Sequence, residues 1–159
     1  MSSINIETRL GHPIENCQND FLSNADLRFY EDIINRHPLA KKRSEVEIHY
    51  NCHGFVFGSR RTGISDSTEI RKILADDGFI KVDSNNVKEG DIVLYIAENG
   101  DIEHSGFVIE EPNKSNYHIP KIYSKWGFGY EFIHWVNDSY YDSSILEYYR
   151  IDTNDSRRP

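Results

Sequence analysis

The apolar residues of this chain change their spacing near residue 78, and this change constrains the fold more than any other feature. Before it, apolar residues recur at helical spacing, whereas after it stretches of β-branched and aromatic residues follow a period of two. Helices followed by antiparallel strands are typical of the α+β class. We therefore expect N-terminal helices packed on an antiparallel sheet.

Residues 1 to about 20 show no periodicity and are expected to form an irregular arm. A first helix should begin near Ser23 or Asn24 and end at His37-Pro38, because proline cannot continue a helix. The basic stretch 41–43 that follows is most simply a solvated loop.

Two further helices are expected before the change in spacing. Asn51 is a good N-cap for a short helix that contains Cys52 and ends at Gly58. Asp66 and Glu69 form a capping-box pattern at the start of the third helix, and a glycine at position 78 ends it.

The second half of the chain contains several candidate strands. Asn99-Gly100 is a strong signal for a hairpin turn between two of them. The last strand is expected to close the sheet before a polar tail. The predicted strands cover residues 79–82, 91–97, 102–110, 119–126 and 146–151.

Length and charge limit the domain organisation and the partners. With 159 residues the chain is the size of one domain, so we expect a single unit over 1–159 with an arm at about 1–20 and a flexible tail at about 152–159. The net charge of −8 disfavours binding to nucleic acid or to an anionic membrane surface. No cofactor motif is visible, because the chain has neither a phosphate-binding loop nor a dinucleotide glycine motif.

The start of the chain and its cysteines indicate the compartment. The first residues show no signal-peptide pattern, and the longest apolar run, Ile92 to Ala97, is far too short to span a membrane. We therefore expect a soluble protein that is cytoplasmic as synthesised. Cys17 and Cys52 are expected to be two reduced thiols, with a single disulfide as the alternative.

Cys52 is the candidate nucleophile. It follows a capping residue, at a helix start where unpaired backbone N–H groups favour a thiolate and can face a developing oxyanion. From position alone, a small buried core residue is an equally good interpretation of a free cysteine.

His104 is the candidate general base. It belongs to the strand after the Asn99-Gly100 turn and shares a face with Gly106 and Val108, where the small glycine leaves room beside the imidazole. A structural histidine held by hydrogen bonds is the alternative.

Three segments together carry a resemblance to a known family. Asn51–Val56 resembles the Asp-Cys-Ser-Gly motif that opens the catalytic helix of NlpC-type papain-like cysteine peptidases and amidases. Gly90–Tyr95 is similar to that family's Gly-Asp-aliphatic strand, and His104–Val108 to its His-Val-Gly-aliphatic strand. The resemblance covers residues 46 to 126 and implies a papain-like fold, with Cys52 as nucleophile and His104 as base.

The family also implies a third polar residue that orients the imidazole from the next strand. Ser124 is the first candidate for that position, followed by Lys125, Glu131 and His134. Two of the candidate substrate-binding residues flank Cys52, and two follow Ser124. They are Asn51, His53, Lys125 and Trp126.

A closer similarity concerns small uncharacterised bacterial proteins with a Cys-His pair. It rests on Tyr50-Asn51-Cys52 and on Ser124-Lys125-Trp126-Gly127, together with His134 and Tyr149. This similarity names relatives but implies no substrate.

The resemblance implies a cysteine hydrolase that cleaves a peptide or peptidoglycan stem-peptide bond through a thioester. Two alternatives keep the same fold: an acyltransferase or deamidase effector, or an inert interaction protein. An effector exported without a signal would have a cognate inhibitor or immunity protein as partner. A metal site at His49, Cys52 and His53 is a minor alternative because it lacks a fourth ligand, so we expect no metal.

Overall fold

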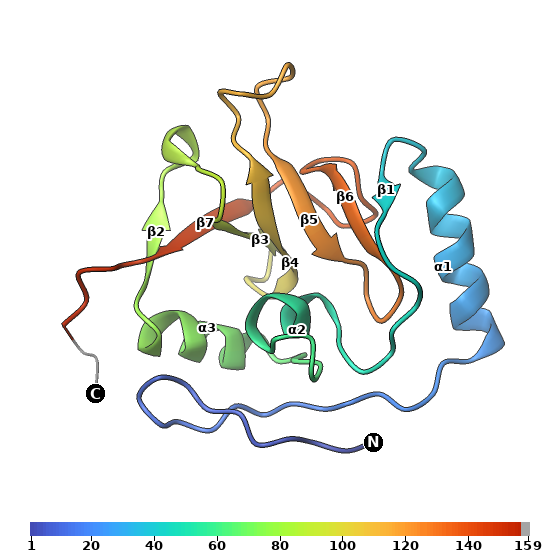
Figure 1. The fold of residues 1–159 in the computed structure, drawn as a ribbon, viewed down its shortest axis with the longest axis horizontal. Helices are drawn as coiled ribbons and strands as arrows, with labels where there is room; N and C mark the ends of the chain where they lie inside the picture. The colour runs from blue at the N-terminus through green and yellow to red at the C-terminus, as the bar shows by residue number, and fades with distance from the viewer. Residues whose placement is uncertain (157–159) are drawn as a thin grey trace.

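The computed structural model describes residues 1–156 and has three α-helices and a seven-stranded antiparallel sheet in that range (Figure 1). The α+β class expected from the sequence is therefore confirmed. The elements are α1 (Asn24–Arg36), β1 (Lys41–Lys42), α2 (Cys52–Phe57), α3 (Ser67–Asp76), β2 (Phe79–Val82), a 3-10 turn η1 (Ser84–Asn86), β3 (Ile92–Ile96), β4 (Ile102–Glu110), β5 (Lys121–Lys125), β6 (Glu131–Trp135) and β7 (Leu146–Ile151).

The sheet differs from the expected one in three respects. The order is β1-β6-β5-β4-β3-β7-β2, so β7 lies between β3 and β2 instead of closing the sheet at an edge. The sequence analysis missed β6 entirely. It was also wrong about residues 41–43, because Lys41 and Lys42 pair with Ile133 and Phe132 of β6 as a short edge strand.

The sheet is buried on both faces. Leu94 of β3 packs toward α3 with Ile70 and Ile73, whereas its neighbour Val93 belongs to a second apolar cluster with Ile122 of β5. Adjacent residues of a strand point to opposite faces, so these clusters lie on the two sides of the sheet. The continuous apolar run in β3 is thus explained by burial of both its faces.

The helix starts follow their capping residues. Ser23 and Asp26 form a reciprocal capping box at α1, and the side chain of Asp66 accepts a hydrogen bond from the backbone N of Thr68 at the start of α3. Glu69 does not complete the capping box expected at α3. Its carboxylate instead accepts hydrogen bonds from the backbone N of Glu15 and from Lys72 Nζ, each at 2.9 Å.

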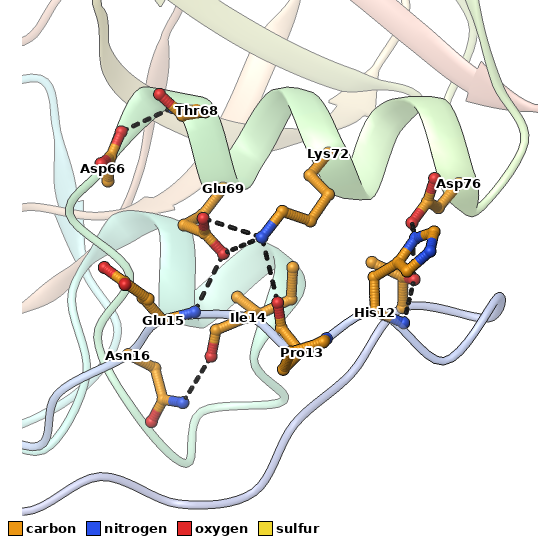
Figure 2. A network of polar contacts seen from close by, with 11 residues as sticks. His12, Pro13, Ile14, Glu15, Asn16, Asp66, Thr68, Glu69, Lys72 and Asp76 are labelled. Atoms are coloured by element: carbon orange, nitrogen blue, oxygen red, sulfur yellow. Dashed lines mark hydrogen bonds and ion pairs between the residues drawn. The ribbon is translucent and has the colours of Figure 1, made fainter.

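Glu69 is therefore part of the attachment of the N-terminal arm to α3, which Figure 2 shows. Lys72 Nζ also donates to the carbonyl of Pro13, and His12 Nδ1 lies 2.6 Å from Asp76 Oδ2 at the other end of the helix. The arm has only isolated β-bridges, as its lack of periodicity predicts, yet these contacts fix it along α3.

The chain end returns to the same region. Arg9 of the arm forms a 2.6 Å ion pair with Asp155, and both side chains are largely buried. The arm, α3 and residue 155 are thus connected. The rest of the predicted tail, residues 157–159, lies outside the described residues.

Within the described range, none of the helices combines the length and the apolar character that crossing a bilayer requires.

Candidate active site

Asn51 determines how the start of α2 is built. Its side-chain oxygen accepts hydrogen bonds from the backbone N of Gly54 at 2.9 Å and of Ile64 at 3.1 Å, while its amide donates to the Ile64 carbonyl at 2.8 Å. The Asn51 side chain therefore caps α2 and also fixes it to the segment before α3. These bonds position Cys52, the first residue of the helix.

Cys52 lines a cavity of about 870 Å³ at one end of the sheet, which we call the Cys52 cavity. Asn51 and His53, two of the predicted substrate-binding residues, line it as well. The rest of the wall comes from the turn before α3, the start of β4, the residues after β5 and the loop before β7. The lining includes Asp66, Glu103, Gly127, Phe128, Tyr140 and Tyr141.

The Cys52 thiol is neutral in this environment. Burial raises its pKa to about 12, and the opposing effects of backbone hydrogen bonds from Ser105 and His53 and of the Lys125 charge do not compensate. Because Cys52 lies at a helix start, the sequence analysis predicts a lowered pKa, which is the opposite direction. A helix of six residues has too small a dipole to offset the desolvation of a side chain that is 4% exposed.

His104 begins a chain of hydrogen bonds that we call the His–Ser–His chain. His104 Nε2 lies 3.0 Å from Ser124 Oγ, which lies 2.7 Å from His134 Nε2, and His134 Nδ1 lies 2.7 Å from the carbonyl of Trp135. All three side chains are at most 2% exposed.

The protons of this chain can be assigned because a carbonyl only accepts. His134 must donate from Nδ1 to Trp135, so its Nε2 accepts the hydroxyl proton of Ser124. The Ser124 oxygen then accepts from His104 Nε2. His104 is therefore protonated on Nε2, and the lone pair on its Nδ1 is free.

His104 Nδ1 is buried and has no hydrogen-bond partner. Burial lowers the pKa of His104 well below its ordinary value, and the charges of His134 and His53 act in the same direction. The imidazole is therefore a neutral base with an open acceptor.

Cys52 and His104 approach the same end of the sheet from different sides. The hydroxyl of Ser105 lies 3.2 Å from the Cys52 carbonyl and 2.8 Å from His53 Nδ1, so the Ser105 side chain faces α2. His104 precedes Ser105 and points to the opposite face. Its strand is irregular there, because Tyr95 pairs with His104 but Ile96 pairs with Ile102.

Tyr141 connects the two candidate residues. Its ring stacks on the His104 imidazole at a centroid distance of 3.8 Å and an interplanar angle of 10°, and it lines the Cys52 cavity. The hydroxyl of Tyr141 accepts from the backbone N of Gly127 at 2.9 Å, which holds the ring in place. Among residues 1–156, no hydrogen bond joins the Cys52 thiol to His104.

Three of the predicted substrate-binding residues have structural contacts. His53 is buried and bonded to the Ile102 carbonyl at 3.0 Å, and burial lowers its pKa to about 4. Lys125 and Trp126 are completely buried and do not line the Cys52 cavity. Lys125 Nζ donates to the Gly129 carbonyl, and burial lowers its pKa to about 8.

Two lower-ranked candidates for the third position differ in their surroundings. His134 is the far end of the His–Ser–His chain. Glu131 instead accepts hydrogen bonds from Tyr50 and Arg60, which flank α2, and from Tyr123 of β5. These bonds lower the pKa of Glu131 against the opposing effect of its burial.

Sequence reasoning missed Tyr141 and the strand β6 that carries His134. The aromatic and β-branched residues Phe132, Ile133 and Trp135, after the glycine-flanked turn at Phe128, were a usable sequence signal for β6. No sequence pattern indicates that Tyr141 covers His104, since it lies in an irregular loop.

No group of three or more His, Cys, Asp or Glu residues in the described part of the chain has a metal-binding arrangement. His49 pairs with Glu47 at the surface. Both cysteines are free thiols.

Comparison with protein-family models, with curated proteins and with solved structures finds no match to this chain.

Proposed function

We propose that the chain is a papain-like cysteine hydrolase of the NlpC type, which cleaves an amide bond in a peptide or a peptidoglycan stem peptide. One observation carries the proposal: the His–Ser–His chain leaves His104 Nδ1 as an open acceptor at the end of the sheet where Cys52 lines a cavity. A nucleophile and a base oriented by a third group are the parts that thiol catalysis requires.

In the proposed reaction Cys52 Sγ attacks the substrate carbonyl carbon and His104 Nδ1 takes the thiol proton. The His104 imidazolium then donates this proton to the leaving amine, and water resolves the thioester with His104 again as base. Backbone N–H groups at the start of α2, including that of Cys52, stabilise the oxyanion. Ser124 has a positioning role, because it fixes the orientation and the tautomer of His104.

The pKa values determine the timing of the proton transfer. The pKa of Cys52 is raised and that of His104 is lowered, so both groups are neutral in the free protein. The proton must therefore move as substrate binds and the sulfur attacks, not before. Attack also requires the sulfur and His104 Nδ1 to come within hydrogen-bonding distance, and among residues 1–156 no hydrogen bond joins them.

A second candidate is an inert interaction protein with the same fold. It is favoured by the burial of Cys52 and by the absence, among the described residues, of a bond between the thiol and His104. The two candidates differ in whether Cys52 forms a covalent bond with a substrate.

The test compares the wild type with Cys52→Ala on muropeptides, unlabelled peptides and acyl donors, with products identified by mass spectrometry. Cys52→Ala should lower any turnover by about 10⁴-fold or more, since the nucleophile is lost. The unfolding free energy should fall by no more than about 2 kcal/mol, because only one sulfur atom is removed from the interior.

Cys17→Ala is the matched control, because Cys17 is the other free thiol and lies outside the Cys52 cavity. It should retain full turnover. Equal turnover of the wild type and Cys52→Ala would exclude the hydrolase, and so would the absence of any acyl-enzyme on Cys52 with every donor.

A further inference from the structure

A second cavity lies on the face of the sheet opposite to α3. It has a volume of about 430 Å³, and we call it the Tyr148 cavity. Val136 and Tyr148 line it, and both belong to the apolar cluster on that face. Two of its walls, η1 and the loop between β4 and β5, lie at the top of Figure 1, whereas α2 and α3 lie at the bottom. None of the residues that line it also lines the Cys52 cavity.

The wall of the Tyr148 cavity combines apolar side chains with a few polar ones. No lysine, arginine, aspartate or glutamate of the described residues lines it, and His118 is the only lining side chain besides Tyr148 that titrates. A charged ligand would lose its hydration there without gaining an ion pair, so the wall favours an uncharged ligand. The apolar members of the lining are Val87, Pro112, Ile119, Pro120, Val136 and Leu146.

Tyr148 contributes a hydroxyl that has no protein partner. Its side chain is only 6% exposed, and no group within residues 1–156 forms a hydrogen bond with the hydroxyl. Burial raises the pKa of Tyr148 to about 12, so the hydroxyl keeps its proton at neutral pH and can donate it to an acceptor.

The other two buried tyrosines of the described chain have partners. Tyr95 donates to the Val136 carbonyl and Tyr50 donates to Glu131, each at 2.6 Å. Most buried polar groups in proteins form such hydrogen bonds, because leaving one unpaired costs free energy. Tyr148 is thus the exception that requires an explanation.

The Tyr148 hydroxyl faces the cavity. The completely enclosed polar side-chain atoms without a partner in residues 1–156 are His104 Nδ1, Trp126 Nε1 and Asp138 Oδ2, and Tyr148 Oη is not one of them. Tyr148 Oη therefore keeps some accessible surface. On a side chain that is otherwise buried, this surface opens into the cavity that Tyr148 lines.

We propose that the Tyr148 cavity binds an uncharged small molecule with a ring-sized apolar body and one hydrogen-bond acceptor, such as a carbonyl oxygen, that accepts from Tyr148 Oη. The volume lies in the range of about 300–1,000 Å³ that is typical of small-molecule sites. The site goes beyond the proposed hydrolase and does not depend on it, because neither Cys52 nor His104 takes part.

The test uses acetophenone as the probe, because it joins one aromatic ring to one carbonyl group. Amide NMR spectra of the isotope-labelled full chain are recorded as acetophenone is added. Binding should saturate with a Kd of about 1 mM, as expected for a ligand of this size. The largest shifts should occur at Asn85, Ile119 and Tyr148, which line the Tyr148 cavity, and not at Gly127, which lines the Cys52 cavity.

Two charged probes of similar size test the uncharged wall. Benzoate carries a carboxylate and 1-phenylethylammonium carries a cation in place of the ketone. Both should bind at least roughly tenfold more weakly than acetophenone, because each must give up hydration without gaining an ion pair.

Tyr148→Phe tests the hydroxyl. This variant should weaken acetophenone binding roughly three- to tenfold, the effect of one hydrogen bond. Toluene, which has no acceptor, should bind the wild type and Tyr148→Phe equally. Tyr149→Phe is the matched control, because the Tyr149 hydroxyl donates to Glu147 and the residue does not line the Tyr148 cavity. It should leave the acetophenone affinity unchanged.

Three outcomes would overturn the inference: no saturable binding of acetophenone, equal affinity of the wild type and Tyr148→Phe for it, or charged probes that bind as tightly as acetophenone. Shifts of the same residues on raising the protein concentration without a probe would assign the cavity to a second copy of the chain and would also overturn it. No turnover is measured, so each of these outcomes leaves the proposed hydrolase as it stands.

Discussion

At the scale of single residues, the function proposed here depends on the proton positions in the His–Ser–His chain. Only one assignment satisfies every group, because the Trp135 carbonyl cannot donate. Ser124 donates its hydroxyl proton to His134 and accepts a hydrogen bond from His104, so the tautomer of His134 fixes that of His104. Removal of its oxygen should therefore release the tautomer of His104 without touching Cys52.

Ser124→Ala should lower kcat by about 10- to 100-fold with little change in KM, since part of the contribution of a positioned base is lost. The imidazolium of His104 also loses its acceptor, so the pKa of the base should fall and the acid limb of the pH–rate profile should move to lower pH. Stability should fall by about 1–3 kcal/mol, because two buried imidazole nitrogens lose their partner.

Ser115→Ala is the matched control for this variant. Ser115 is a buried serine in the loop between β4 and β5, and its oxygen accepts from the backbone N of Tyr117. It should cost stability without moving the pH–rate profile. If Ser124→Ala also leaves the profile unmoved, Ser124 has only a structural role.

At the scale of elements, the position of Cys52 depends on how closely α2 approaches the segment before α3. A Cβ atom on Gly54 would lie 1.7 Å from the carbonyl oxygen of Thr62 and 2.8 Å from its carbonyl carbon. Backbone atoms cannot move aside as a flexible side chain can. Glycine at position 54 is therefore required for the docking of α2.

Gly54→Ala should lower the unfolding free energy by about 3 kcal/mol or more, because the helix must shift or the 62–64 segment must open. Gly58→Ala provides a graded comparison, since the nearest atom to its Cβ, the Gly54 carbonyl oxygen, is 3.0 Å away. Urea unfolding of both variants measures the difference. A similar loss in the two would contradict the close approach at Gly54.

The sequence predicted the elements whose signals are local. Capping residues located the three helix starts, and period-two patterns located β2, β4 and β7 to the residue. The position of β7 inside the sheet could not be predicted, because partner choice depends on contacts between distant residues. β1 was missed because a two-residue edge strand of lysines has no apolar pattern.

In the candidate site, too, the features that depend on local sequence were predicted, and those that depend on contacts with distant segments were not. Ser124 was selected because it lies on the strand after His104, and its hydrogen bond to His104 follows from that neighbouring position. The raised pKa of Cys52 and the stacking of Tyr141 on His104 were not predictable. The first depends on the burial of Cys52 and the second on the path of the loop before β7, and no local pattern indicates either.

At the scale of the whole molecule, the folded state excludes protons from three buried imidazoles. His53 lies on the face that α2 covers, and His104 and His134 lie on the other. The folded protein lowers the pKa of all three, mainly through burial. The unfolded chain has no such restriction and binds these protons near pH 6.5.

This difference makes the fold sensitive to acid in a defined window. Lowering the pKa of a histidine from 6.5 in the unfolded chain to about 4 in the folded protein favours the folded state at acidic pH less than at neutral pH. Above pH 6.5 the buried neutral imidazole does not reduce the unfolding free energy, and this stability is lost as the pH falls toward 4. By pH 5 the loss should be roughly 2 kcal/mol for each of His53 and His134. Urea unfolding at pH 7 and at pH 5 measures this loss of unfolding free energy.

His53→Gln should reduce the pH dependence by roughly 2 kcal/mol, whereas His118→Asn, which removes an exposed imidazole, should not. An unchanged dependence in His53→Gln would show that carboxylates alone cause the acid sensitivity, and would remove the buried neutral imidazoles from the account of stability.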